Sequence, residues 1–427
     1  MWKPFLARSL RSVLGGRRRH AVPPDGADRI FSRAYTGREP KVGGGGGGEG
    51  RLRSNRHHKQ QRPHLYVVLR DWKEKQDVYS FNKLRLDGAL EDMNGGGTSE
   101  GDGMEKGSAQ NLRRLPEPIL RIGSRGIGTH ARIHALGSNI VVTGNRLTLV
   151  YGTDTGELDI VGQDLPDELR WHYDAVAAGG KLHALHAPFY LWEAPKPVES
   201  GYDDGFDDED ETEGWTWTWD DCRSPTPMPT SAGASYELAA HAVHPDGRTV
   251  FVSFDRLSDA RAHHTFSLDT QSGEWTHRGN WRLPFHHQGH YDGDLEAWVG
   301  LAALGTGGGS RYYHLSSCDV PDLAGGSKPP PPACRLGREK LTLCKAHLTA
   351  TAHSPVLVHT GHGRLCIVEA APLERASADD RSGILRVTMF RPKYAKNGEL
   401  AIAATPKAAR SYLISGATSF EGLAFWM

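Results

Sequence analysis

The stretch ARIHALGSNIVVTG, residues 131–144, consists of a strand-like run, a Gly-centred turn and a second strand-like run. The pattern returns at 173–187, 239–254 and 354–370, and in weaker form at 291–304. Repeats at roughly this spacing indicate a repeat architecture, and four-stranded propeller blades are its antiparallel β form. Helical periodicity is weak, and Gly, Gly-Gly or Asp-Gly turns separate the runs. We therefore predict an all-β fold.

Two segments resemble the kelch repeat. AAGGKLHAL, residues 177–185, has a double glycine between two strand-like runs, and FSLDTQSGEWTH, residues 266–277, has Asp-Thr turn residues followed by Trp275. LVYGTDTGELDI at 149–160 repeats the second pattern with Leu158 in place of the Trp. The resemblance implies a kelch-like β-propeller of five to seven four-stranded blades, in which the Trp fills the gap between neighbouring blades. Two β-sandwiches are the alternative all-β fold.

The order of segments over 64–427 also resembles a group of uncharacterised plant proteins, in which a kelch-like propeller is described as a domain of unknown function. The resemblance is carried by HLYVVLRDW (64–72), LPEP (115–118), IHALGSNIVV (133–142) and the TDTG turn (153–156). The Gly-rich segments 43–50 and 94–103 depart from that group. The resemblance implies no catalytic residue, cofactor or known ligand.

The chain divides into a leader and one folded region. Residues 1–62 are basic and Gly-rich, and polyglycine cannot offset its ordering entropy by burial, so we expect disorder there. Its Arg-rich, acid-free start is typical of a transit peptide for mitochondrial or plastid import; a nuclear address and a plain basic tail are the alternatives. We expect the propeller over 63–427, with the first strand pairing in the last blade beside 384–392 and 411–416. Inserted loops are expected at 91–111, 196–214 and 322–337.

Composition limits the function classes. The chain has 51 basic and 51 acidic residues, which does not favour specific nucleic-acid binding, and no apolar run is long enough for a transmembrane helix. Five cysteines without a C-x-x-C pair argue against a disulfide framework or zinc site. We predict an intracellular monomer, cytoplasmic or nuclear if the leader is not an import signal.

A Gly-rich segment partly matches a dinucleotide-binding turn. RIGSRGIGTHARIHALGSNIVVTGNR, residues 121–146, has Gly126 and Gly128 where the last two glycines of a G-x-x-x-G-x-G motif would stand, but Ile122 occupies the first position. Such a motif needs a helix after the turn, and here a short segment leads directly to a strand. We therefore favour a loop followed by a strand.

Other polar clusters have two interpretations each. His286, His287 and His290, and His359 with His362, could ligate a metal through neutral imidazoles, but both stretches are interpreted as turns and surface histidines are favoured. The acidic run 203–213 could bind calcium or a basic partner, and a solvated loop is favoured. Alternation places Trp215, Trp217 and Trp219 on one strand face, where packing between blades is favoured over a sugar or peptide platform.

These patterns favour binding over catalysis. No G-x-S-x-G elbow is present, and we assign no catalytic, cofactor or metal residue. We predict a non-enzymatic protein-interaction module whose propeller-face loops engage a protein or peptide partner. The alternative is an enzyme or small-ligand binder that uses the central funnel. A third hypothesis is that the basic leader binds anionic lipid or nucleic acid.

Overall fold

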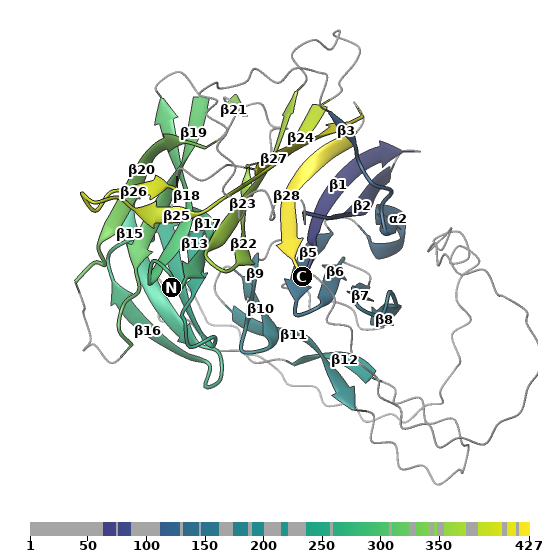
Figure 1. Cartoon of the computed structure of the whole chain (residues 1–427). Coiled ribbons are helices and arrows are strands. Elements are labelled where there is room, and N and C mark those ends of the chain that lie inside the picture. The colour runs from purple at the N-terminus through teal and green to yellow at the C-terminus, as the bar shows by residue number, and fades with distance from the viewer. Residues whose placement is uncertain are drawn as a thin grey trace, which may run out of the picture.

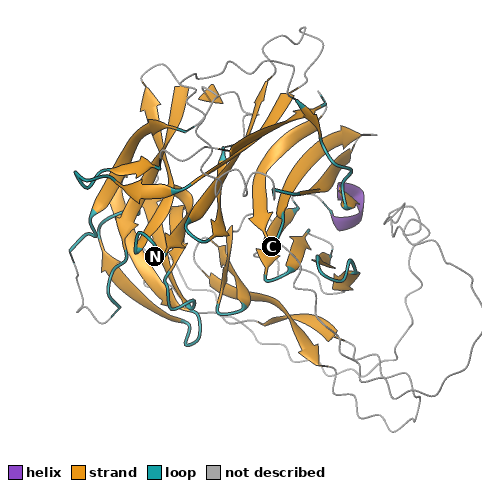
Figure 2. Cartoon of the chain, viewed as in Figure 1, coloured by secondary structure: helices purple, strands orange, loops and turns teal. Residues whose placement is uncertain are grey.

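The computed structural model describes the folded region in seventeen segments: residues 63–73, 76–86, 112–128, 131–144, 147–161, 174–186, 190–199, 215–220, 236–256, 259–306, 310–323, 330–341, 346–347, 354–372, 383–403, 408–415 and 418–427. These residues form strands joined by turns, with one helical turn, α2 (Ser124–Ile127) (Figures 1 and 2). The prediction of an all-β fold is confirmed. The predicted leader (1–62), the loop 91–111 and most of 196–214 lie outside the described residues.

Within the described residues the strands form five sheets of four or more strands and one hairpin. The nine-stranded sheet consists of two antiparallel halves joined by the parallel pair β13–β17, and we number these halves separately, which gives sheets one to six in chain order. Sheet one has the order β28 (Thr418–Trp426), β1 (Leu65–Lys73), β2 (Gln76–Leu84), β4 (Leu120–Gly123). Sheet two is β5 (Arg132–Leu136), β6 (Asn139–Thr143), β7 (Thr148–Gly152), β8 (Leu158–Val161). Sheet three is β9 (Asp174–Ala178), β10 (Lys181–His186), β11 (Tyr190–Glu199), β12 (Trp215–Asp220).

The second half of the chain forms the other sheets. Sheet four is β13 (Tyr236–Val243), β14 (Thr249–Arg256), β15 (Asp259–Asp269), β16 (Glu274–Gly279). Sheet five is β17 (His286–Asp292), β18 (Ala297–Thr306), β19 (Ser310–Asp319), β20 (Cys334–Lys340), with β21 (Ala346–His347) also on β19. Sheet six is β22 (Val356–Gly361), β23 (Arg364–Pro372), β24 (Gly383–Phe390), β27 (Ala408–Ile414), β3 (Arg113–Arg114); the hairpin is β25 (Pro392–Tyr394) with β26 (Leu400–Ile402).

Sheet one contains strands from both ends of the described region. β28 pairs with β1 in antiparallel register, and the backbone N–H of His64 donates to the carbonyl of Met427 over 2.6 Å (Figure 1). The prediction that the first strand pairs with a C-terminal strand is confirmed. Its predicted partners are wrong, because 384–392 and 411–416 contribute to β24 and β27, which pair with each other in sheet six.

The burial pattern explains the choice of β28. Phe420 and Ala424 of β28 pack on one side of sheet one, whereas Leu423 and Phe425 pack on the other, so both faces of this strand meet apolar neighbours. In β27 one face is buried, and Leu413 on the other face is 46% exposed. A strand that is apolar on both faces suits a position between two packed layers, whereas a one-faced strand suits an outer position.

Six buried clusters each join two sheets. They connect sheets one and six, six and five, five and four, four and three, three and two, and two and one. The period-two alternation of strands makes this arrangement available to one sequence. In β1, Leu65 and Val67 face sheet six while Tyr66 and Val68 face sheet two. Each sheet is therefore covered by another sheet on both faces.

Glycine turns join the strands as the repeats predict. Between β9 and β10, Gly179 and Gly180 have φ angles of 60° and 76°, a conformation that glycine adopts without steric cost. After β15, Gly273 has a φ of 72°, and Trp275 packs its ring edge-on to Phe266, 6.4 Å between centroids, in the cluster between sheets three and four. The turn glycines and the packing position predicted for the Trp are both present.

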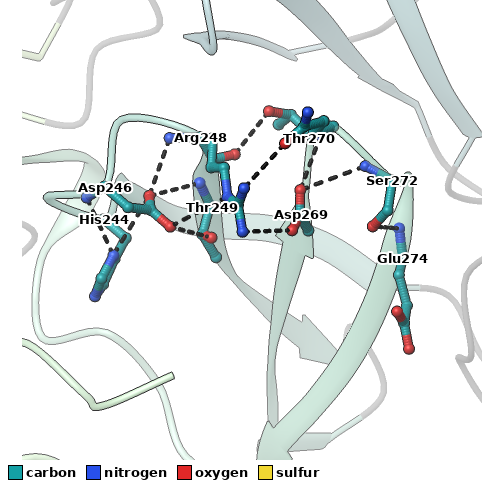
Figure 3. A network of polar contacts seen from close by, with 9 residues as sticks. His244, Asp246, Arg248, Thr249, Asp269, Thr270, Ser272 and Glu274 are labelled. Carbon is teal, nitrogen blue, oxygen red and sulfur yellow. Dashed lines mark hydrogen bonds and ion pairs between the residues drawn. The ribbon is translucent and has the colours of Figure 1, made fainter. Parts of the chain in front are cut away.

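A polar network fixes the turns of sheet four (Figure 3). Asp246 accepts hydrogen bonds from the backbone N–H groups of Arg248 (3.0 Å) and Thr249 (2.8 Å). Arg248 lies 3.4 Å from the Asp269 carboxylate, which ties the β13–β14 turn to the β15–β16 turn. The N–H of Gly179 donates to the carbonyl of Gly247 over 2.7 Å, so the network also holds sheet three to sheet four.

Two of the predicted loops have different bounds in the structure. The predicted loop 322–337 ends too late, because β20 starts at Cys334, two positions after the last of the prolines, which cannot donate to a ladder. The predicted loop 196–214 starts too early, because Lys196 to Glu199 still pair with β12. The segment at Gly126 forms a four-residue helical turn and then β5, so the interpretation as a loop and strand is confirmed in outline.

Candidate functional site

Strands β13 and β17 join the two halves of the nine-stranded sheet, and β22 of sheet six lies next to β17. β13 and β17 pair in parallel, with Ala240 opposite His287 and His241 opposite Gln288. The imidazole Nε2 of His290 lies 2.8 Å from the carbonyl oxygen of Leu357 on β22. β22 also contacts β28, the strand at one end of the order of sheet one, so strands of sheets four, five, six and one adjoin in series.

Four histidines on these strands form what we call the histidine cluster: His241, His287, His290 and His359. Burial lowers the pKa of His241 to about 3, and the neighbouring His287 and His290 lower it further. Burial lowers the pKa of His290 to about 4, although its hydrogen bond to the Leu357 carbonyl acts in the opposite direction. The pKa values of His287 and His359 are also lowered by burial. At neutral pH the cluster is therefore a set of uncharged imidazoles, able to donate and accept hydrogen bonds.

Carboxylates border the cluster. Asp174 at the start of β9 and Glu237 on β13 are exposed, and both raise the pKa of His287 against the effect of burial. The residue His287 is itself exposed, yet enough protein surrounds its ring for desolvation to be the larger effect. The His287 side chain is therefore accessible to water at the edge of the cluster, although neighbouring protein atoms desolvate its ring. On the other side, Asp292 is buried and its charge acts on His359.

Three of these histidines lie in the two separate groups named from the sequence, for which surface histidines in turns were favoured, and their local structure was predicted incorrectly. Residues 286–290 and 359 belong to strands β17 and β22 rather than to turns, because β17 pairs with both β13 and β18. His287 has a φ of 62° and interrupts the β17–β18 register, so a bulge rather than a turn accounts for its irregular pattern. His286 stacks on His287 at 4.2 Å between ring centroids. His362 is exposed in the turn after β22.

His241 was not identified from the sequence. It lies in YELAAHAV, the only polar side chain between small apolar residues near the end of that strand. His241 is half-buried, and a polar residue partly enclosed in such a strand is informative because it needs a partner. Which partner it meets depends on the parallel pairing of β13 with β17, which joins positions far apart in the chain.

The structure gives no support to the other candidate sites, which are a metal site, the acidic run and the Trp strand. Among the described residues, no group of three or more His, Cys, Asp or Glu side chains is arranged to hold a metal ion. The acidic run 203–213 lies outside them. Trp215, Trp217 and Trp219 lie in strand β12, as alternation predicts, and only its backbone is described. The described part of the chain also contains no helix that is long and apolar enough to cross a membrane.

Comparison with known proteins finds one matching family model and several solved structures of low sequence identity. Among curated proteins, none matches the chain. An ulvan lyase, described as a new family of polysaccharide lyase, is 11% identical, with 84% of this chain and 93% of that chain covered and a TM-score of 0.35. AztD from Citrobacter koseri is 10% identical, covering 83% and 99%, with a TM-score of 0.31. A protein of unknown function from Dyadobacter fermentans is 11% identical, covering 84% and 95%, with a TM-score of 0.25.

A family model described as "Protein of unknown function (DUF1668)" matches residues 62–411. The match begins where β1 is about to start and runs through β24 into β27, so it includes every strand that carries the histidine cluster. The chain belongs to the DUF1668 family.

Proposed function

We propose that the six sheets are the blades of a kelch-like β-propeller. In chain order, each of sheets two to five contributes four consecutive strands, as blades do. The buried clusters couple the sheets in a closed order, one to two and onward to six, and six back to one. Pairing of β28 with β1 would then complete one blade from strands at both ends of the described region and cover exposed sheet edges. The kelch character of the repeats and the plant origin of the chain stay predictions.

We further propose that the protein is a non-enzymatic interaction module that binds a basic peptide segment of a partner at the first strands of the blades. The observation that carries this proposal is the histidine cluster with Asp174 and Glu237 beside it. Because the imidazoles are uncharged, the charge at this site comes from the bordering carboxylates. Carboxylates form charge-assisted hydrogen bonds with Lys and Arg side chains. The imidazoles can accept or donate the remaining hydrogen bonds of the peptide.

Catalysis at the same cluster is less well supported. A general base works best when its pKa lies near the working pH. The pKa values of His241 and His290, at about 3 and about 4, are several units too low for that role at neutral pH. Binding of a small ligand in a central funnel stays as the second hypothesis, because the same hydrogen-bonding groups would serve a small polar molecule.

Selection of peptides from a random library on the immobilised full-length protein tests this function. We expect the selected peptides to be enriched in Lys and Arg. Affinity for them should fall about tenfold in Glu237→Gln, the loss of one charge-assisted hydrogen bond. Glu274→Gln, an exposed carboxylate on β16 outside the cluster, is the matched control and should bind as the wild type does.

Two outcomes would reject the proposal. Selected peptides without excess positive charge would remove the argument from the carboxylates. Equal binding by Glu237→Gln and the wild type would place the interaction elsewhere, on the inserted loops for example. Turnover of a metabolite by the wild type, lost in His287→Ala, would favour the enzyme hypothesis instead.

A further inference from the structure

Two cysteines oppose each other across neighbouring strands of sheet five. Cys318 lies near the end of β19 and Cys334 begins β20, and the two residues are direct cross-strand partners. The N–H of Asp319 donates to the carbonyl of Ala333 over 3.0 Å, so the next pair along the ladder is the hydrogen-bonded one. Cys318 and Cys334 therefore form a non-hydrogen-bonded pair, in which Cα atoms are about 4.5 Å apart. That separation lies inside the range that a disulfide spans.

The two thiols differ in environment. Cys318 is fully buried in the cluster between sheets four and five, whereas Cys334 is exposed. The thiols are hydrogen-bonded to each other, and the Sγ of Cys334 also lies 3.3 Å from the carbonyl oxygen of Pro332. Neither cysteine forms a disulfide in this structure. The Cys334 thiol is thus accessible to solvent, and the buried Cys318 thiol contacts it from the interior.

We propose that Cys318 and Cys334 are an oxidation site, at which a hydroperoxide converts the two thiols to a cross-strand disulfide. The Cys334 thiolate attacks one oxygen of hydrogen peroxide, forming a sulfenic acid and releasing hydroxide, which takes the proton that left the thiol. The Cys318 sulfur then attacks the sulfenic sulfur, and the hydroxyl group and the Cys318 proton leave as water. Two thiols and one peroxide give one disulfide and two waters.

The surroundings favour Cys334 as the attacking group. The hydrogen bond from Cys318 lowers the pKa of the Cys334 thiol, and the adjacent Arg335 guanidinium acts in the same direction, while burial and Asp319 oppose them. The same hydrogen bond, together with burial, raises the pKa of Cys318. Because the thiolate is the nucleophile, peroxide should react first at the exposed sulfur, and the buried sulfur should resolve the product.

The bond would reinforce one edge of sheet five. β20 is the last strand in its order and follows the prolines at 330–332. Arg335, next to Cys334, is held by Asp319 at 2.7 Å and lies over the Tyr394 ring, 4.8 Å from its centroid. These contacts keep the start of β20 in place, so little movement is needed to form the bond.

Peptide mapping of the full-length chain tests this inference. The reduced protein is treated with hydrogen peroxide, alkylated under denaturing conditions and digested. We expect a linked pair of peptides containing Cys318 and Cys334, with both positions protected from alkylation and restored by a reductant. Cys366→Ser removes a fully buried cysteine of sheet six and is the matched control, which should keep the linkage.

Two variants make the result decisive. In Cys334→Ser, an exposed change, the linkage is lost and Cys318 should stay alkylatable at the same peroxide dose. In Cys318→Ala, Cys334 should instead be trapped as a sulfenic acid adduct by a dimedone probe. A linkage of Cys334 to Cys222 or Cys344, or oxidation of Cys334 to a sulfinic acid in the wild type with Cys318 still reduced, would overturn the proposal.

Discussion

At the scale of single residues, the half-buried imidazole of His290 predicts loss of stability in acid. Its pKa is lowered to about 4 in the folded chain, chiefly by burial, against about 6.5 in an unfolded chain. Between about pH 6.5 and pH 4, His290 is therefore protonated in the unfolded state but not in the folded state. The contribution of His290 to the free energy of unfolding is fully present above about pH 6.5. It is lost as the pH falls towards 4, by up to about 1.4 kcal/mol per pH unit.

The variant His290→Gln keeps an amide donor for the Leu357 carbonyl but cannot titrate. Urea unfolding at pH 7, 6 and 5 should show a free energy of unfolding that falls less steeply than in the wild type. His362→Asn, at an exposed turn position with a φ of 54° that Asn tolerates, should leave the wild-type slope unchanged. Parallel slopes for His290→Gln and the wild type would mean that His290 accepts a proton in the folded state.

Single residues were predictable from sequence only where their role is local. The glycines at 179 and 180 predict their turn correctly, because a positive φ angle depends on the residue itself and needs no distant partner. His241 and the pair of Cys318 with Cys334 gave no such signal. The odd number of cysteines and the lack of a C-x-x-C pair argued against disulfides, but these two cysteines become neighbours through the β19–β20 register.

At the scale of elements, the double-glycine turn between β9 and β10 predicts a purely conformational cost of substitution. A Cβ on Gly180 would meet no atom within 4 Å, but the residue has a φ of 76°. Gly180→Ala should therefore lower the free energy of unfolding by about 1–2 kcal/mol, the cost of a left-handed conformation for an L-residue.

A second turn glycine supplies the control. Gly293, between β17 and β18, also has open space around its Cβ position but no positive φ. Gly293→Ala should leave stability unchanged or raise it by up to about 1 kcal/mol, because alanine restricts the unfolded chain. Equal losses for both variants in guanidinium unfolding would show that the φ angle of Gly180 is not the cause. Gly180→Asn should recover part of the loss, since Asn adopts this conformation more readily.

Elements were predicted well where strands alternate between turn glycines and poorly where prolines or histidines dominate. A histidine-rich run such as 286–290 lacks apolar alternation, so its strand depends on pairing with β13 and β18. Likewise, β20 has a mostly exposed burial pattern and is held by its ladder to β19 and by the contacts of Arg335. Neither kind of support is visible in a local window of sequence.

At the scale of the whole molecule, the repeats predicted several small antiparallel sheets but not which strand joins the two ends. The runs at 384–392 and 411–416 are strand-like, as is 418–426, and local pattern cannot rank them. The deciding property is that β28 is apolar towards two different sheets. That property is recognisable only once the neighbouring sheets are known.

Phe420 on β28 therefore allows a test of the proposed ring. Its side chain is buried between sheets one and six, so Phe420→Ala should cost about 3–5 kcal/mol. If the six sheets form a closed ring, opening it at β28 should destabilise all of them together. Hydrogen exchange should then quicken not only in β28 and β1 but also in β14 of sheet four, which has no contact with Phe420 in the described clusters.

The matched control is Leu413→Ala on the outward face of β27, which should change stability by less than about 0.5 kcal/mol and leave exchange in β14 as it is. Faster exchange limited to sheets one and six in Phe420→Ala would mean that each sheet unfolds with its neighbours alone. In that case the pairing of β28 with β1 would be a local contact, and the propeller proposed here would lose its closure. A single calorimetric transition, lowered as a whole in Phe420→Ala, supports the ring, because each sheet then depends on two neighbours for the burial of both faces.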